Sequence, residues 1–145
     1  MTNFLATAET DIAASPARVW EVLTDPDELR QIWFGAEVKT DWRPGSPITW
    51  SGEYDGKAYE DRGEILEVDP GRLLKVTHFS PLSGQPDVPE NYHTLTYRLD
   101  SHGTSTHLSL TQDNNASEEE AAHSRGMWEQ LVAKVKETAE AQSVT

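Results

Sequence analysis

The feature that most constrains the fold is a central region, residues 36–114, in which apolar and polar residues alternate with a period of two. Short turn sequences interrupt the alternation, among them Asp55-Gly56 and Asp69-Pro70-Gly71. Strands joined by such short turns run antiparallel, because a parallel connection needs a dozen or more residues. The region therefore predicts an antiparallel meander of about six strands.

Proline and glycine separate the strands of this meander. Pro44-Gly45 divides the first two strands, and residues 80–91, rich in proline, are expected to form a loop. A turn at Ser101-His102-Gly103 precedes the last strand and should leave His102 in solvent. We expect strands around Val38 and Trp42, around Ile48, Trp50 and Tyr54, and over residues 57–68, 73–79, 93–100 and 104–112.

One strand and two short helices are expected before the meander. Residues 4–13 alternate loosely and end at Ser15-Pro16, the expected N-cap and first residue of a helix that stops near Thr24. Asp25-Pro26 repeats the same start signal. The second helix is therefore short, and it should end in the apolar cluster Ile32-Trp33-Phe34.

The C-terminal segment is predicted to be one long helix. Residues 117–120, a serine followed by three glutamates, open it with a capping box and with acids where the helix dipole favours them. Apolar residues then recur at a spacing of three to four, so Trp128 and Leu131 should face the sheet. An antiparallel sheet can leave only one face to water, so this helix should cover the other. The residues expected to face water are Glu129, Lys134 and Lys136.

The charge balance limits the classes of partner. The chain of 145 residues has 25 acidic and 12 basic residues, a formal net charge of −13, and the basic residues are scattered singly. Such a field repels phosphate backbones and anionic lipids, so we expect no nucleic-acid or membrane partner. Residues 1–7 lack the basic and apolar parts of a secretion signal, and no stretch approaches the roughly 20 apolar residues that span a bilayer. We therefore expect a cytoplasmic protein.

Three segments carry a resemblance to a known family. They are residues 15–26 followed by Trp33, residues 54–73 with their Tyr-Asp-Gly-Lys and Gly-Glu-Ile-Leu-Glu-Val-Asp-Pro runs, and Gly126-Met127-Trp128 in the final helix. In this order they resemble the START-like or SRPBCC superfamily, specifically its branch of activator of heat-shock-protein ATPase homologues. The resemblance covers nearly the whole chain and implies one helix-grip domain over residues 1–145. Such an α+β domain has two short helices after strand one and a curved antiparallel sheet of six to seven strands around the long C-terminal helix.

The aromatic residues indicate where a ligand would bind in such a domain. The resemblance implies an apolar cavity between sheet and helix, and Trp and Tyr add polar groups to an apolar wall, which suits a pocket that orients an apolar ligand. The alternative is a closed core. The residues expected at the cavity are Trp33, Phe34, Trp50, Tyr54, Tyr59, His78, His93, Tyr97, Met127, Trp128, Leu131 and Val135.

Two histidines are candidates for polar contacts in this cavity. His93 alternates in phase with Leu95 and Tyr97, and His78 with Val76, so both should point toward the cavity or its rim. An imidazole there can bind a ligand or act as a base, although a purely structural role is the alternative. No carboxylate partner can be assigned to His93, so we expect it to bind ligand without performing chemistry.

Two further patterns contain acidic residues. Tyr59 and Asp61 share one strand face. If that face were the inner one, a phenol and a carboxylate would meet the ligand. Arg62 on the other face favours the alternative, an edge strand whose acidic side chains face water.

Glu120-Ala121-Ala122-His123 has the spacing of metal ligands, but di-metal bundles need two such units and this chain has one. We interpret this unit as a solvated helix face, and we expect neither a metal nor a cofactor.

These features favour a binding protein for a small, apolar or amphipathic molecule, held between the sheet and the C-terminal helix. One alternative is an enzyme of the cyclase, hydratase or hydrolase type that uses His93 or Asp61 in the same cavity. Another is an interaction module similar to the chaperone ATPase activators, whose acidic surface docks a basic protein partner.

Overall fold

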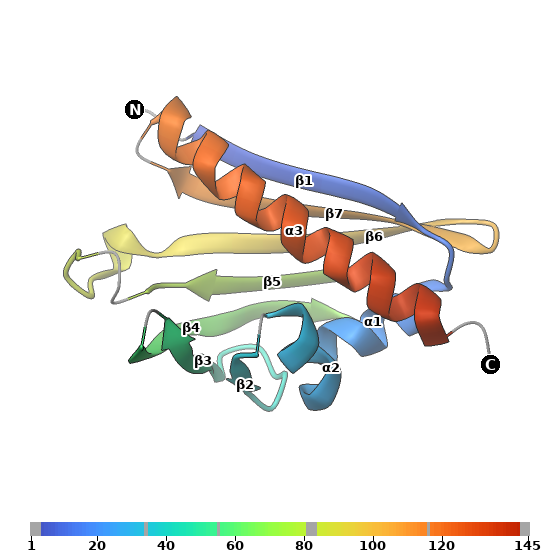
Figure 1. Cartoon of the computed structure of the whole chain (residues 1–145), viewed down its shortest axis with the longest axis horizontal. Helices are drawn as coiled ribbons and strands as arrows, with labels where there is room; N and C mark the ends of the chain where they lie inside the picture. The colour runs from blue at the N-terminus through green and yellow to red at the C-terminus, as the bar shows by residue number, and fades with distance from the viewer. Residues whose placement is uncertain (1–3, 34, 55, 81–83, 116, 143–145) are drawn as a thin grey trace.

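The fold, seen in a computed structural model, is a seven-stranded antiparallel sheet with three α-helices on one side (Figure 1). These elements are counted over the described residues, 4–33, 35–54, 56–80, 84–115 and 117–142. In chain order they are β1 Phe4–Ile12, α1 Pro16–Thr24, α2 Pro26–Ile32, β2 Glu37–Lys39, β3 Pro47–Tyr54, β4 Lys57–Asp69, β5 Leu73–His78, the 3-10 helix η2 Pro89–Asn91, β6 His93–His102, β7 Ser105–Asn115 and α3 Glu118–Gln142.

The strand order is β1-β7-β6-β5-β4-β3-β2, and every neighbouring pair is antiparallel. Strands β2 to β7 therefore form the predicted meander, and β1 joins its far edge beside β7. Figure 1 shows α3 crossing the sheet obliquely, with α1 and α2 beside its C-terminal half. The arrangement is the helix-grip fold that the sequence predicted.

The helix starts follow the predicted capping chemistry. The Ser15 hydroxyl accepts a hydrogen bond from the backbone N–H of Arg18, and the Asp25 carboxylate accepts from two N–H groups at the start of α2. Ser117 accepts from the N–H of Glu120 at 3.1 Å in the same way. These local bonds fix where the helices begin, because each satisfies an N–H that the helix itself leaves free.

The prediction of a strand through Trp42 is wrong. β2 ends at Lys39, and Trp42 has a positive φ of 61°. The chain turns there because the Thr40 hydroxyl accepts from the Trp42 N–H and the Asp41 carboxylate accepts from the Arg43 N–H. Elsewhere the strands run longer than predicted, since β6 reaches His102 and β7 reaches Asn115.

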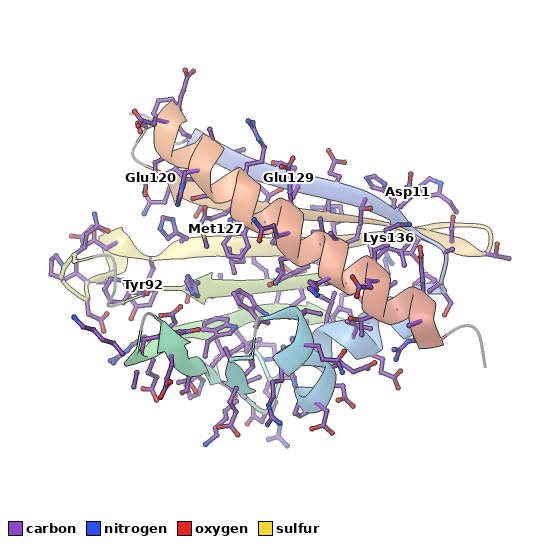
Figure 2. All side chains as sticks on the ribbon, viewed as in Figure 1. Asp11, Tyr92, Glu120, Met127, Glu129 and Lys136 are labelled. Carbon is purple, nitrogen blue, oxygen red and sulfur yellow. The ribbon has the colours of Figure 1, made fainter. Side chains whose placement is uncertain are left out.

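The phase of α3 agrees with the sequence pattern in most positions. Trp128 and Leu131 are buried against the sheet, and Glu129 is exposed, as is Lys134. The side chain of Lys136 is 43% exposed, and its ammonium also donates to the backbone oxygen of Asp11 on β1 at 2.8 Å (Figure 2). No helix in the described part of the chain is long and apolar enough to cross a bilayer.

Arg18 joins the three helices. Its guanidinium, on α1, forms ion pairs with Glu21 on the same helix and with Glu28 on α2. The same group donates to the backbone oxygen of Thr138 near the end of α3 at 3.2 Å. Because the side chains of Arg18 and Glu28 are each only 14% exposed, this pair fixes α1 and α2 against α3 better than a solvated pair could.

Candidate functional site

A row of polar side chains crosses the inner face of the sheet. We call it the polar row: Asp61 on β4, His78 on β5, His93 on β6 and Gln112 on β7. His78 and His93 are directly paired in the β5–β6 register. Asp61, His78 and Gln112 are buried, with exposed fractions of 9%, 9% and 5%, and His93 is partly buried. Polar groups so deeply buried require hydrogen-bond partners.

Asp61 and His78 form a hydrogen-bonded pair. The distance from His78 Nε2 to Asp61 Oδ2 is 2.9 Å, and both side chains are almost completely withdrawn from water. With a carboxylate as acceptor, Nε2 carries the hydrogen, so Nδ1 of a neutral imidazole keeps its lone pair free. The interaction thus orients the imidazole and fixes its tautomer.

The expectation that Asp61 faces water at a sheet edge is wrong. β4 has β5 on one side and β3 on the other, so it is an interior strand. Asp61 is the register partner of the buried Trp50, which places it beside the core. Arg62, on the outer face, forms an ion pair with Asp87 at 3.2 Å instead.

Three tryptophans surround the imidazole of His78. This aromatic cluster consists of Trp33 at the end of α2, Trp50 on β3 and Trp128 on α3. The Trp33 ring lies at its centre, with centroids 5.6 Å from Trp50, 5.8 Å from Trp128 and 6.3 Å from His78. Trp50 also contacts His78 edge-on at 4.8 Å. The end of α2, strand β3 and α3 therefore meet at a largely aromatic contact.

Four buried polar atoms in this region have no hydrogen-bond partner among the described residues. They are Asp61 Oδ1, His78 Nδ1, Gln112 Oε1 and Trp128 Nε1. A buried polar atom without a partner costs about 1–3 kcal/mol, and native proteins rarely contain several together. The set combines two oxygen acceptors, an imidazole nitrogen and an indole N–H donor, so it can bind a molecule that both accepts and donates hydrogen bonds.

The space beside the aromatic cluster is small. A cavity of about 10 Å³ lies between Trp33, Trp42, Trp50, Tyr97 and neighbouring aliphatic side chains. This volume is close to the minimum that holds one water molecule, whereas a drug-sized ligand occupies roughly 300–1,000 Å³. The open cavity expected from the sequence is therefore closed in this conformation, because side chains, Trp33 among them, fill it.

The described residues among the others expected at the cavity do not all lie at this cluster. Tyr97 is buried and lines the small cavity, and burial raises the pKa of its phenol. Leu131 and Val135 belong to the core. Met127 is 50% exposed on the solvent side of α3 (Figure 2). Phe34 and the side chain of Tyr54 lie outside the described part of the structure.

Tyr59 and His93 lie at the margins of the site. Tyr59 is partly buried; burial and, to a smaller extent, the charge of Asp61 raise the pKa of its phenol. The Nδ1–H group of His93 already has a hydrogen-bond partner, since it donates to the backbone oxygen of Asp113 at 2.8 Å. Of the two histidines expected at the cavity, it is therefore His78, and not His93, that has a carboxylate partner.

Sequence reasoning missed the Asp61–His78 pair and Gln112. The turn at residues 69–71 indicated that their strands are neighbours, but a count outward from this turn places Asp61 opposite a residue beyond His78. A register shift between Ile65 and Glu67 disturbs that count, so simple alternation does not give the exact neighbours. Gln112 alternates in phase with Leu108 and Leu110, which was a direct signal that it faces inward.

The remaining titratable clusters do not form a comparable site. Glu120 and His123 are both exposed on α3, as the solvated-face interpretation predicted. Within the described residues, no group of three or more acidic or histidine side chains is arranged to hold a metal ion. The site is therefore defined by the polar row and the aromatic cluster.

Comparison with known proteins gives the family. The family model described as activator of Hsp90 ATPase homolog 1-like protein matches residues 13–140. The solution structure of ChR145 from Cytophaga hutchinsonii is 41% identical with a TM-score of 0.84, and the match covers 98% of this chain and 97% of that one. No curated protein matches the sequence.

More distant solved structures share the fold alone. The Aha1 dimer from Colwellia psychrerythraea is 19% identical with a TM-score of 0.72, and the match covers 97% of both chains. CalU16 from Micromonospora echinospora is 20% identical with a TM-score of 0.71, over 99% of this chain and 90% of that one. The family match and the ChR145 match span nearly the whole sequence, so the chain belongs to the family of activator of Hsp90 ATPase homolog 1-like proteins.

Proposed function

We propose that this protein binds a small, planar, mostly apolar molecule between the sheet and α3, at the aromatic cluster. The observation that carries the proposal is the set of four unpartnered, buried polar atoms: Asp61 Oδ1, His78 Nδ1 and Trp128 Nε1 at the aromatic cluster, and Gln112 Oε1 further along the polar row. A core that serves only stability gains nothing from them, because each one lowers the free energy of unfolding. A bound molecule with a few polar groups would satisfy them.

The ligand would occupy the place that the Trp33 indole now fills. Trp33 is the residue that ends α2, so its side chain can turn outward without breaking a strand ladder or the interior of a helix. It is also only partly buried, unlike Trp50 and Trp128. A planar ring in its place would stack on the same two tryptophans and lie beside His78.

The four atoms favour an amphipathic ligand. Asp61 Oδ1 and Gln112 Oε1 accept hydrogen bonds, and Trp128 Nε1–H donates one. A ligand that carries both a hydroxyl and a carbonyl group on a planar ring system would match these groups. A pure hydrocarbon would leave all four atoms unpaired.

Titration with the uncharged fluorophore N-phenyl-1-naphthylamine tests this proposal. We expect 1:1 binding to the folded protein, with energy transfer from tryptophan to the probe. Trp50→Leu should weaken binding about tenfold because it removes a stacking partner. Trp20→Leu is the control: Trp20 lies on α1, outside the aromatic cluster, and its loss should change affinity less than about twofold.

Absence of probe binding to the wild-type protein, with folding verified by circular dichroism, would contradict the proposal. Equal affinities of the wild-type and Trp50→Leu proteins would contradict the location.

A second candidate function is an enzyme of the cyclase, hydratase or hydrolase type acting on such a ligand. The observation that favours it is the hydrogen bond between Asp61 and His78, which supplies the carboxylate-oriented imidazole that His93 lacks. The third interpretation, an acidic module that docks a basic protein, is supported by the family match and by the net charge of −13.

A further inference from the structure

We infer that His78 is a general base, that Asp61 positions it, and that the substrate is a planar fused-ring ketone with an acidic C–H group next to its carbonyl. The inference rests on the proposed function, because it uses the same site.

The geometry of the Asp61–His78 pair is that of an oriented base. Asp61 Oδ2 accepts from Nε2 of His78 at 2.9 Å, and Nδ1 on the other side of the ring is buried without a partner among the described residues. A carboxylate in this position holds the tautomer with a free lone pair and stabilises the imidazolium that forms after proton transfer. Nδ1 is therefore the atom that receives the substrate proton.

The other four histidines lack this arrangement. Nδ1 of His93 donates to a backbone oxygen, and His107 lies on the outer face with both ring nitrogens bonded to Glu9 and Asp11. His102 and His123 are exposed. In the part of the chain that the structure describes, His78 thus combines burial, a carboxylate partner and a free ring nitrogen.

The surroundings of His78 give the class of substrate. The Trp33 indole contacts Trp50, Trp128 and His78, so a fused two-ring molecule that replaced it would meet all three. Trp128 offers a buried, unpartnered N–H to a carbonyl oxygen, and His78 offers an unpartnered basic nitrogen to an acidic C–H. A ketone presents these two groups on adjacent atoms.

The reaction step is an enolisation. His78 Nδ1 takes the proton from the carbon next to the carbonyl, the C–H electron pair forms a C=C bond, and the carbonyl π electrons move to oxygen. Trp128 Nε1–H donates to the enolate oxygen that results. The imidazolium then returns a proton to carbon or to oxygen, so the step balances without an oxidant, a reductant or a further reactant.

Deuterium exchange into 2-tetralone, a fused-ring ketone close to indole in size, measures this step. In D₂O the wild-type protein should exchange the methylene hydrogens next to the carbonyl faster than buffer, as followed by proton NMR. His78→Gln should lower kcat about 100-fold or more, the usual contribution of a general base. His123→Gln, a control at an exposed histidine of α3 outside the site, should keep the wild-type rate.

Asp61→Asn tests the positioning role. The amide keeps the shape of the side chain but favours the tautomer with a hydrogen on Nδ1, so kcat should fall about 100-fold while KM stays within about twofold. A residue needed only for packing would instead change stability or KM. This variant also provides the test if His78→Gln fails to fold.

The outcomes separate the inference from the proposed function. If 2-tetralone quenches tryptophan emission but exchanges no faster than in buffer, or equally fast with His78→Gln, the general base is refuted and ligand binding stands. If N-phenyl-1-naphthylamine binds and 2-tetralone does not, the substrate class is refuted. If neither molecule binds, the proposed function fails and this inference fails with it.

Discussion

Trp33→Ala tests how the closed interior is related to the ligand site. The substitution removes the ring at the centre of the aromatic cluster, which packs on Trp50, Trp128 and His78 at centroid distances of 5.6, 5.8 and 6.3 Å. It leaves the backbone of α2 unchanged, because Trp33 follows the last helical residue. The cavity of about 10 Å³ should grow by the volume of the lost indole.

The magnitude follows from the burial of the side chain. Replacing a buried Trp by Ala costs about 3–5 kcal/mol through lost transfer energy and cavity formation. Trp33 is only partly buried, so we expect a loss of about 2–4 kcal/mol in the free energy of unfolding. Urea unfolding followed by far-UV circular dichroism measures this loss.

Added indole should restore stability if the vacated space is a binding site. At 100 times its Kd, a ligand that binds only the folded state contributes about 2.7 kcal/mol, which is most of the loss. Trp20→Ala on α1 is the control, and indole should not restore its stability. A loss below about 0.5 kcal/mol would show that Trp33 does not hold the elements together. If Trp33→Ala loses the expected stability and added indole restores none of it, the idea that the Trp33 ring occupies a ligand-binding space is refuted.

Three further predictions concern single residues. Gly63→Ala should destabilise the protein by more than about 2 kcal/mol, because the new Cβ would lie 1.8 Å from a backbone oxygen of β5; an unchanged urea midpoint would contradict this close approach. Trp128→Ala should cost about 3–5 kcal/mol, and a loss within about 0.5 kcal/mol would mean that the phase of α3 is wrong. Hydrogen bonds to Glu9 and, to a smaller extent, to Asp11 raise the pKa of His107 in the folded protein. The stability that these bonds contribute is fully present when the pH is below the pKa of the unfolded state, near 6.5, and is lost as the pH rises through the higher pKa of the folded state. The unfolding free energies of the wild-type protein and His107→Gln should therefore differ more at pH about 6 than at about 9, and a constant difference would refute the assignment.

The fold was predictable because its signals are local. The period of two, the short turns and the helix caps at Ser15, Asp25 and Ser117 act within a few residues, and the structure contains each of these caps. The wrong prediction of a strand at Trp42 also has a local cause. Side-chain bonds from Thr40 and Asp41 turn the chain there, and alternation of apolar residues carries no information about them.

The site was predictable only in part, because it depends on relations between distant elements. Whether Asp61 faces water depends on β4 having neighbours on both sides, which no property of β4 itself reveals. The contacts of Trp33 with Trp50 and Trp128 join three elements, and their closeness depends on how α2 and α3 pack on the sheet. The volume of the interior then depends on the rotamer of one side chain, Trp33, which no spacing rule fixes.

The cost of moving Trp33 also determines how tightly the wild-type protein can bind. A ligand that replaces the Trp33 ring binds a conformation with the indole outside, and its apparent affinity falls by the fraction of molecules in that conformation. Opening gives up the same contacts that Trp33→Ala removes, so it costs about 2–4 kcal/mol and reduces affinity roughly 30- to 1,000-fold. Trp33→Ala should thus bind N-phenyl-1-naphthylamine tighter than wild type by that factor. Equal affinities would mean that the probe does not displace Trp33, and tighter binding by wild type would mean that the indole contacts the ligand as part of the site wall.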